Sequence, residues 1–210
     1  MPAYKVMIFI DFWNFSLPLE KIIMPDGKNF LINWFKVPET LVNSLKTIEG
    51  LSGINFQYQH CHVVGSYGPN DSKLRPWVKS TLSRVPGLKT WFLPRRKLES
   101  GPVCTGPSHH EISACPSCGS PMLGYKEKGV DTAIVTLMVQ NAWEGLYDMA
   151  VLVSSDKDFV PVIEFLDRKG IKCVQAGFRG SGYELGQKSW ASIDIMSVCE
   201  QFRRRSDLTE

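Results

Sequence analysis

Short apolar runs alternate with amphipathic segments along most of this chain. The uninterrupted runs Val6–Ile10 and Met149–Val153 are typical of strands that are covered on both faces. Further strands are predicted over residues 56–64, 88–93, 171–176 and 192–196. Helices are predicted over residues 38–49, 74–84, 159–169 and 183–189, and between Gly129 and Gly145, whereas the polar and aromatic segment after the first strand is predicted to be a loop. This alternation predicts an α/β fold with a mostly parallel sheet and helices on both faces.

Residues 99–124 interrupt the alternation. Gly, Pro, Ser, Cys and His dominate this segment, and its apolar periodicity disappears. We therefore predict one domain over residues 1–200, an inserted module over residues 99–124 and a polar tail over residues 201–210.

Composition narrows the class of protein but does not identify a partner. The 210 residues are 43% hydrophobic, which excludes a disordered or fibrous chain, and the net charge of +3 is too small to indicate a polyanionic ligand. No segment approaches the roughly 18 apolar residues that cross a bilayer, and the first apolar run is too short for a signal peptide and ends at Asp11. We expect a soluble, cytoplasmic protein without membrane contact; its oligomeric state is open, a homodimer included.

Four aspartates stand where a parallel sheet gathers functional groups. Asp11 follows the first strand, Asp156 and Asp158 follow the strand at 149–153, and Asp131 lies in the first turn of the preceding helix. Because the carboxyl ends of parallel strands meet at one edge, these side chains are expected to share a small space.

Crowded carboxylates repel one another, by roughly 1 kcal/mol at about 4 Å in water, so they need a cation or a helix N-terminus. A single aspartate at a helix start is most often an N-cap, and Asp158, just ahead of Phe159 and Pro161, is a candidate for that role. Four acids at one edge instead predict a Mg²⁺ or Mn²⁺ site, because these ions prefer oxygen ligands.

Three blocks of sequence resemble the NYN domains of the PIN-like nuclease superfamily. They are "IFIDFWNF" (8–15), "KEKGVDTAIVTLM" (126–138) and "VLVSSDKDFVPVIEFLDRKGIKCV" (151–174), and they occur in the order of the family. The resemblance implies a three-layer α/β/α Rossmann-like fold with a five-stranded sheet ordered 3-2-1-4-5, and metal-dependent cleavage of RNA. It also implies the site residues, which are Asp11, Asp131, Asp156 and Asp158 as metal ligands and Asn14 as a supporting residue.

The expected mechanism follows from this set of ligands. The cation would hold a phosphate oxygen and lower the pKa of a bound water, with Asp11 and Asp156 as direct ligands and Asp131 and Asp158 ligating through water or acting as base. One departure from the family is that Phe12 and Trp13 replace small residues. Two bulky rings there either narrow the cleft or offer a stacking surface.

A basic stretch, residues 73–97, contains no Asp or Glu and interleaves cations with Trp77, Trp91 and Phe92. This pattern suits RNA phosphates and unpaired bases, although a solvated face over core aromatics gives the same pattern. The predicted RNA-binding residues are Arg75, Lys79, Arg95, Arg96 and Lys97 from this stretch, together with Trp13, Lys126 and Lys128. The two last lysines are equally well explained as solvated loop residues.

The inserted module, "CTGPSHHEISACPSCG" (104–119), carries a zinc pattern. Cys115 and Cys118 form a Cys-x-x-Cys knuckle followed by Gly, and Cys104 with His110 would complete a structural Zn²⁺ site in a zinc-ribbon-like insertion, with His109 as the alternative to His110. The other interpretations are a loop with unligated thiols or a redox pair, but no helix start adjoins the motif as a thioredoxin-type site requires.

The leading hypothesis is therefore a metal-dependent, NYN-type ribonuclease, an endonuclease. A rival keeps the fold and binds RNA without cleaving it. A third hypothesis, a phosphatase of the haloacid dehalogenase type, requires a second Asp two residues after the first, where this chain has Trp13.

Overall fold

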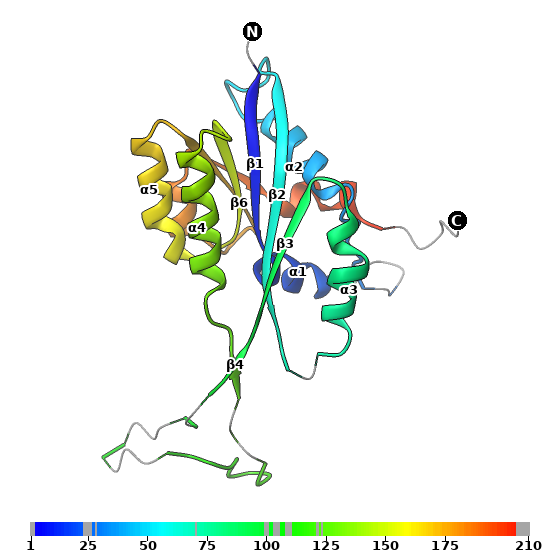
Figure 1. Cartoon of the computed structure of the whole chain (residues 1–210), viewed down its shortest axis with the longest axis vertical. Coiled ribbons are helices and arrows are strands. Elements are labelled where there is room, and N and C mark those ends of the chain that lie inside the picture. Colours follow the sequence, from blue (N-terminus) through cyan, green and yellow to red (C-terminus); the bar gives the residue numbers. More distant parts are fainter. Residues whose placement is uncertain are drawn as a thin grey trace.

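A computed structural model describes residues 3–22, 27, 29–69, 71–98, 101–102, 106–107, 111–120, 122 and 124–204. Its central sheet has six parallel strands in the order β3-β2-β1-β6-β7-β8 (Figure 1). The strands are β1 (Tyr4–Asp11), β2 (Phe56–Tyr67), β3 (Leu88–Pro94), β6 (Met149–Val153), β7 (Lys172–Gly177) and β8 (Ala191–Asp194). The predicted α/β fold is confirmed. The sheet has one strand more than the five that the resemblance implied, because β8 pairs with the outer side of β7.

The central strand β1 owes its position to its apolar run. Ile8 is level with Cys61 of β2 on one side and with Val151 of β6 on the other. Every residue from Val6 to Ile10 is 0% exposed. Alternate side chains point to opposite faces, so Ile8 and Ile10 enter one hydrophobic core and Phe9 enters the other.

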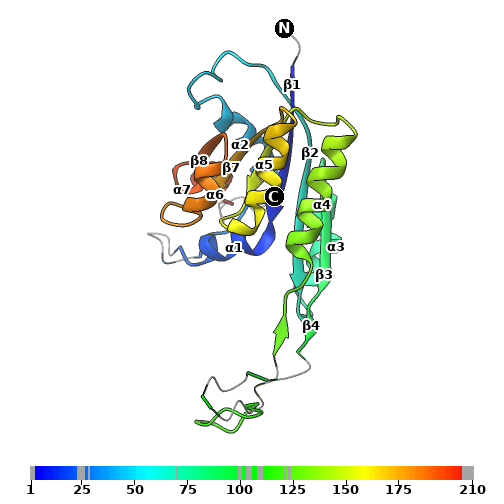
Figure 2. The ribbon, with the colours of Figure 1, turned by 90° about the vertical axis from the view of Figure 1, so that its left-hand side faces the viewer.

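Helices cover both faces of the sheet (Figure 2). The helices are α1 (Phe12–Glu20), α2 (Val37–Leu45), α3 (Leu74–Ser80), α4 (Val130–Trp143), α5 (Val160–Arg168), α6 (Tyr183–Lys188) and α7 (Ile195–Val198). Short 3-10 turns are η1 (Leu82–Arg84), η2 (Lys157–Phe159) and η3 (Cys199–Phe202). The core on the α4 and α5 face also receives Leu185 of α6, and the core on the other face receives side chains from α1, α2, α3 and α7. The molecule is thus a three-layer sandwich.

The segment after β1 is a helix, so the prediction of a loop there was wrong. Helix α1 begins directly at Phe12, and Asp11 is its N-cap. Phe12, Phe15 and Leu19 are buried at a helical spacing, which stabilises the helix although it contains Pro18. The run of aromatic residues and the proline concealed this period in the sequence.

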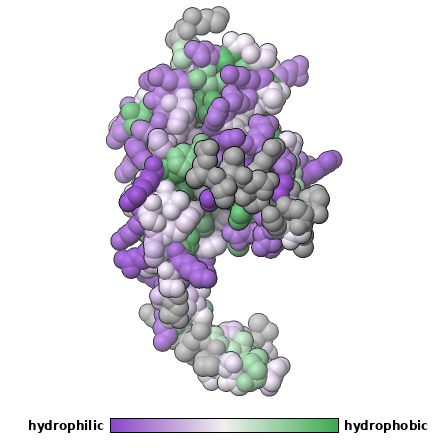
Figure 3. Space-filling view, turned by 90° about the vertical axis from the view of Figure 1, so that its right-hand side faces the viewer, coloured by the Kyte–Doolittle hydropathy of each residue, from purple (hydrophilic) through white to green (hydrophobic). Residues whose placement is uncertain are grey.

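The inserted segment projects from the body as an arm (Figures 1 and 2). Its base is an antiparallel ribbon of β4 (Arg96–Lys97) and β5 (Tyr125–Lys126). We call residues 95–126 the arm. None of its described residues belongs to either hydrophobic core. Figure 3 shows the same narrow extension below a body whose visible side is largely hydrophilic.

The chain remains packed on the body up to Arg204. Phe202 is 0% exposed, and its carbonyl oxygen accepts a 2.8 Å hydrogen bond from the amide of Asn33. The amide of Arg204 donates to the carbonyl oxygen of Leu31 at 2.7 Å. The first residues of the predicted polar tail therefore pair with the segment before α2. Among the helices of the described residues, none has the length and apolar character needed to span a membrane.

Candidate active site

Three aspartates converge at the carboxyl ends of the central strands. One ligand oxygen from each of Asp131, Asp156 and Asp158 lies within 4.8 Å of the other two. Asp131 stands in the first turn of α4, while Asp156 and Asp158 follow β6. Burial and the charges of Asp156, Glu127 and Asp158 raise the pKa of Asp131. We call these three residues the acid trio. The negative charges of Asp156 and Asp158 thus oppose the ionisation of Asp131, as expected of a cation site.

The backbone between β6 and α5 brings two of these carboxylates to the same place. Asp156 has an extended backbone and caps η2, because its Oδ1 accepts a 2.9 Å hydrogen bond from the amide of Asp158. The amide of Asp156 in turn donates to the hydroxyl of Ser154 at 3.1 Å. Asp158 was a candidate for this cap, but Asp156 makes it. The Asp158 carboxylate lies with that of Asp156 in the trio.

Asp11 adjoins the acid trio but is held differently. It is 2% exposed, and its Oδ1 accepts hydrogen bonds from the amides of Trp13 (3.1 Å) and Asn14 (3.2 Å). Its Oδ2 accepts a 2.7 Å hydrogen bond from the Asn14 side chain. Burial raises the pKa of Asp11 to about 6, with smaller contributions from the charges of Glu127 and Asp131 and opposition from the Asn14 hydrogen bonds. The charges of Asp131 and Glu127 therefore act on Asp11, while its oxygens are bonded within α1.

Glu127 is an acid of this region that sequence reasoning missed. Its carboxylate accepts a hydrogen bond from the hydroxyl of Ser66 on β2, and its charge raises the pKa of both Asp11 and Asp131. The only sequence signal was its position four residues before Asp131. The two lysines on either side of it had suggested a basic segment instead.

Trp13 and Arg95, both predicted to bind RNA, are partly buried and contact each other. The Arg95 guanidinium carbon lies 5.1 Å from the centre of the Trp13 ring, and its Nε donates to the Ser66 hydroxyl at 3.0 Å. Trp13 Nε1 donates to the Ser66 carbonyl oxygen at 2.9 Å. This network joins α1, β2 and the start of the arm. Both side chains thus support the architecture around Glu127.

Phe12 does not narrow the site. It is 5% exposed and packs in the core, with its ring centre 5.9 Å from that of Trp34 and 5.0 Å from that of Phe92. The bulky pair after Asp11 therefore fills the core on the α1 face and the neighbourhood of Arg95.

The structure divides the predicted basic residues into two groups. Arg75 and Lys79 are exposed on α3, where the Arg75 guanidinium lies 5.5 Å from the centre of the Tyr67 ring. A second group is exposed on the ribbon and just after it, next to Glu127; it comprises Arg96, Lys97, Lys126 and Lys128. Of the two groups, only the second includes residues that directly precede α4, the helix that carries Asp131.

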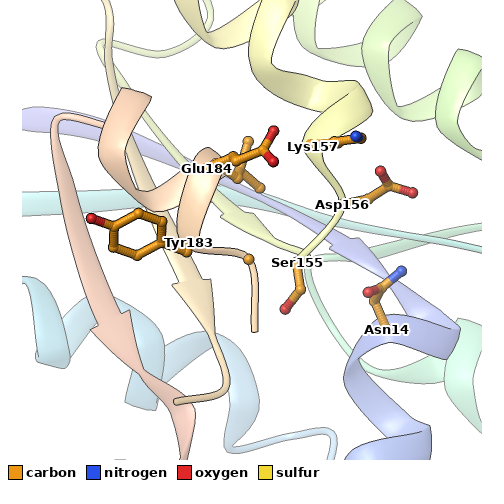
Figure 4. A pocket seen from close by; sticks show the side chains of 8 residues that line it. Asn14, Ser155, Asp156, Lys157, Tyr183 and Glu184 are labelled. Atoms are coloured by element: carbon orange, nitrogen blue, oxygen red, sulfur yellow. The ribbon is translucent and has the colours of Figure 1, made fainter. Parts of the chain in front are cut away.

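A cavity of about 490 Å³ opens beside Asp156, at the carboxyl ends of the neighbouring strands β1 and β6. From β1 the chain adds β2 and β3 on one side, and from β6 it adds β7 and β8 on the other, so the strand order reverses here. Such a reversal of strand order is the usual place for a binding crevice. In Figure 4 the Asp156 side chain lies between Lys157 and Asn14, with Glu184 near Lys157 and the Tyr183 ring further off. The lining residues are Asn14, Ser155, Asp156, Lys157, Gly182, Tyr183, Glu184 and Leu185.

The structure describes only part of the predicted zinc site. Cys104, His109 and His110 lie outside the described residues. Cys115 and Cys118 form a tight turn, in which the amide of Gly119 donates to the Cys115 carbonyl oxygen at 2.8 Å. Hydrogen bonds with Ser120, and then with Cys115, lower the pKa of the exposed Cys118 thiol. A thiol that deprotonates readily is suited to metal binding, and zinc in the arm stays a prediction.

Comparison with known proteins identifies the family. The sequence profile of the NYN domain matches residues 5–203. The chain belongs to the NYN domain family. Its fold is similar to the crystal structure of a protein of unknown function from Vibrio parahaemolyticus, with a TM-score of 0.59, 16% sequence identity, and coverage of 96% of this chain and 97% of that one. No curated protein matches the sequence. NYN domains are generally nucleases, so the family agrees with an acid site at this edge of the sheet.

Proposed function

We propose that this NYN domain is a ribonuclease that hydrolyses RNA phosphodiester bonds, with Mg²⁺ or Mn²⁺ held by Asp131, Asp156 and Asp158. The observation that carries the proposal is the approach of three carboxylate oxygens to within 4.8 Å of one another. The donor set fits these ions, because all its ligand atoms are carboxylate oxygens and the charges of Asp156 and Asp158 raise the pKa of Asp131. A bound dication would polarise a phosphate oxygen and lower the pKa of a coordinated water.

The residues of the chain around the trio have separate tasks in this proposal. Asn14, oriented by its hydrogen bond to Asp11, lines the 490 Å³ cavity together with Asp156 and Lys157. Lys157 adds a positive charge to the lining of this cavity, and the ribbon adds exposed cations at the base of the arm, both of which suit RNA phosphates. Asp11 supports the site from below, because its two oxygens hold the first amides of α1 and the side chain of Asn14 in place.

A second candidate function is RNA binding without cleavage, and the hydrogen bonds of Asp11 favour it. Its oxygens accept three hydrogen bonds within α1, which leaves three rather than four acids grouped at the site. The burial of Asp11 speaks against a phosphatase of the haloacid dehalogenase type. The nucleophilic Asp of such an enzyme has to reach the substrate, and Asp11 is 2% exposed.

One assay separates these functions. Labelled RNA, labelled DNA and a small phosphomonoester are incubated with wild type and with Asp156→Asn, with and without Mn²⁺. We expect Mn²⁺-dependent cleavage of RNA that falls on the order of 10²–10³-fold in Asp156→Asn. Asparagine keeps the cap of η2, so the fold should survive.

The matched control is Asp194→Asn. This residue caps α7 at the end of β8, where its Oδ1 accepts from the amide of Met196, and it lies outside the trio. The Asp194→Asn variant should cleave RNA at the wild-type rate. Full activity in Asp156→Asn would refute the proposal, whereas tight RNA binding by an inactive wild type would select the second candidate.

A further inference from the structure

A second cavity, of about 430 Å³, lies between the edge strand β3 and the start of α4. The aromatic side chain in its lining is that of Trp91, which is 51% exposed although it lies on a strand of the central sheet. Leu93 and Ala133 pack against the core and give the cavity an apolar floor. The lining residues are Trp91, Leu93, Arg96, Lys128, Gly129, Thr132, Ala133, Thr136 and Leu137.

This cavity and the acid trio flank the same turn of helix. Asp131 belongs to the trio, and Thr132, the next residue, lines the cavity. The cavity is lined from one face of α4, by residues at the helical spacing of 129, 132, 133 and 136. Successive helical residues are rotated by about 100°, so Asp131 leaves the helix from a different face. The cavity and the trio therefore lie on different sides of the start of α4, and one extended strand would pass over that start to reach both.

The charge at this cavity favours a polyanion. Arg96 and Lys128 contribute the charged groups of its lining, which contains no Asp or Glu. Gly129, with a left-handed φ of 90°, begins α4 without a side-chain cap, so the first amides of α4 have no capping oxygen from that residue. The positive end of a 14-residue helix thus adds to the two cations.

We propose that this cavity binds one unpaired base of an RNA strand, stacked on Trp91, with the adjoining phosphates held by Arg96 and Lys128. The inference rests on the proposed ribonuclease function and deepens it, because it makes the substrate single-stranded. A base inside a duplex is stacked on both faces and offers none to a tryptophan, whereas unpaired bases stack readily on aromatic side chains. The bound base belongs to the same strand as the bond that the trio attacks, on the other side of the start of α4.

Trp143 provides a matched control. It is 82% exposed at the other end of α4, and it lines a separate apolar cavity with Val139 and Phe165 that contains no residue of the trio. Its removal deletes the same kind of ring as Trp91→Ala does, but from the end of α4 that is far from Asp131.

The test measures binding of short fluorescent oligonucleotides by anisotropy, with Asp156→Asn as the parent so that cleavage does not interfere. Adding Trp91→Ala should weaken single-stranded RNA binding about tenfold, Trp91→Phe should restore most of it, and Trp143→Ala should change nothing. A series of RNAs with a single abasic position should show one position that weakens binding to the parent and has no further effect on Trp91→Ala. Thermal melting of each variant verifies folding.

Equal binding by Trp91→Ala and its parent would overturn the inference, as would duplex RNA that binds as tightly as single strands with the same dependence on Trp91. Cleavage by wild type is scored separately. If wild type cleaves RNA and Trp91 has no effect, only the base site is lost. If wild type does not cleave RNA, the ribonuclease proposal fails, and the abasic series still decides whether the base site exists.

Discussion

The body and the arm of this NYN domain differ in what holds them together. The body is built on strands whose side chains are buried on both faces, such as Val6–Ile10 at 0% exposure. The arm has a ribbon of two residue pairs at its base, and none of its described residues enters a core. Isolated two-stranded ribbons are at best marginally stable in water. The body can therefore position side chains by packing alone, while the arm needs further support.

This difference explains where the chemistry is placed. The acid trio stands on elements anchored by the core, because Asp131 follows the buried Val130 and Asp158 precedes the buried Phe159. The arm contributes exposed cations at its junction with the body, where long-range attraction tolerates less exact positions. Experiments that disturb one region should leave the other largely intact.

Zinc removal should have the largest effect, and it should be confined to the arm. Structural zinc contributes about 10–16 kcal/mol in small zinc domains, so chelation or Cys118→Ser should unfold the arm while the body stays folded. Limited proteolysis should then cut within residues 95–126, and circular dichroism should change little. The exposed Ser117→Ala, between the two cysteines, serves as control. Unchanged proteolysis, or less than about half an equivalent of zinc in purified protein, would contradict the prediction.

Truncation of a core ring should destabilise the body and spare the arm. Phe9 is 0% exposed and its ring centre lies 5.4 Å from that of His62, so Phe9→Ala should lower the free energy of unfolding by about 3–5 kcal/mol. Urea denaturation measures the loss, and Phe9→Leu should show a smaller one. Trp143→Ala should stay within about 0.5 kcal/mol of wild type. A change in zinc content in Phe9→Leu would show that the two regions are coupled.

The pH dependence of stability should reveal the burial of Asp11. Its folded-state pKa of about 6 lies above the ordinary 3.8, so its contribution to stability is present below 3.8 and is lost as the pH rises through about 6. Asp11→Asn, which stays neutral, should gain stability relative to wild type over that range, by up to about 3 kcal/mol. Urea denaturation in EDTA measures the difference.

Asn14→Ala sharpens this experiment. The hydrogen bonds from Asn14 lower the pKa of Asp11, so removal of the side-chain donor should move the transition to higher pH. A difference between Asp11→Asn and wild type that does not vary with pH would exclude burial as the cause.

A single ribbon lysine should have the smallest effect. Lys126 is exposed on β5, and Lys126→Gln should weaken RNA binding modestly and reduce the slope of log affinity against log salt by about one. Lys46→Gln makes the same charge change at the end of α2, far from the arm (Figure 1), and should leave the slope unaltered. An equal slope in the two variants would remove the ribbon from the RNA interface.

Much of the fold could be predicted from local patterns. The strand Met149–Val153 was predicted with the bounds that the structure shows, because five successive buried apolar residues need no further context. Helix α4 was predicted from its apolar period and from the glycines at 129 and 145. Helix α1 was missed because its stabilising contacts, such as Phe15 against Phe202, come from residues far along the chain.

The location of the acid site could be predicted from the sequence, whereas its set of metal ligands stays a prediction. The motifs placed Asp131, Asp156 and Asp158 at one edge, and the structure brings them together. Asp158 was only a candidate for the cap that Asp156 makes, because capping depends on backbone angles that a sequence does not display. Glu127 gained its role only through Ser66, which is 61 residues away.

The sequence by itself determined the parallel sheet and the edge at which acids gather, since strand periodicity and order along the chain are local properties. Tertiary structure alone decided which side chains point into that edge. It buried Asp11 within α1, moved Phe12 into the core, paired Arg95 with Trp13 and left Trp91 half exposed. The physical reason is that burial and hydrogen-bond partners are set by residues distant in sequence, and these two quantities decide whether a charged or aromatic side chain supports the fold or meets a ligand.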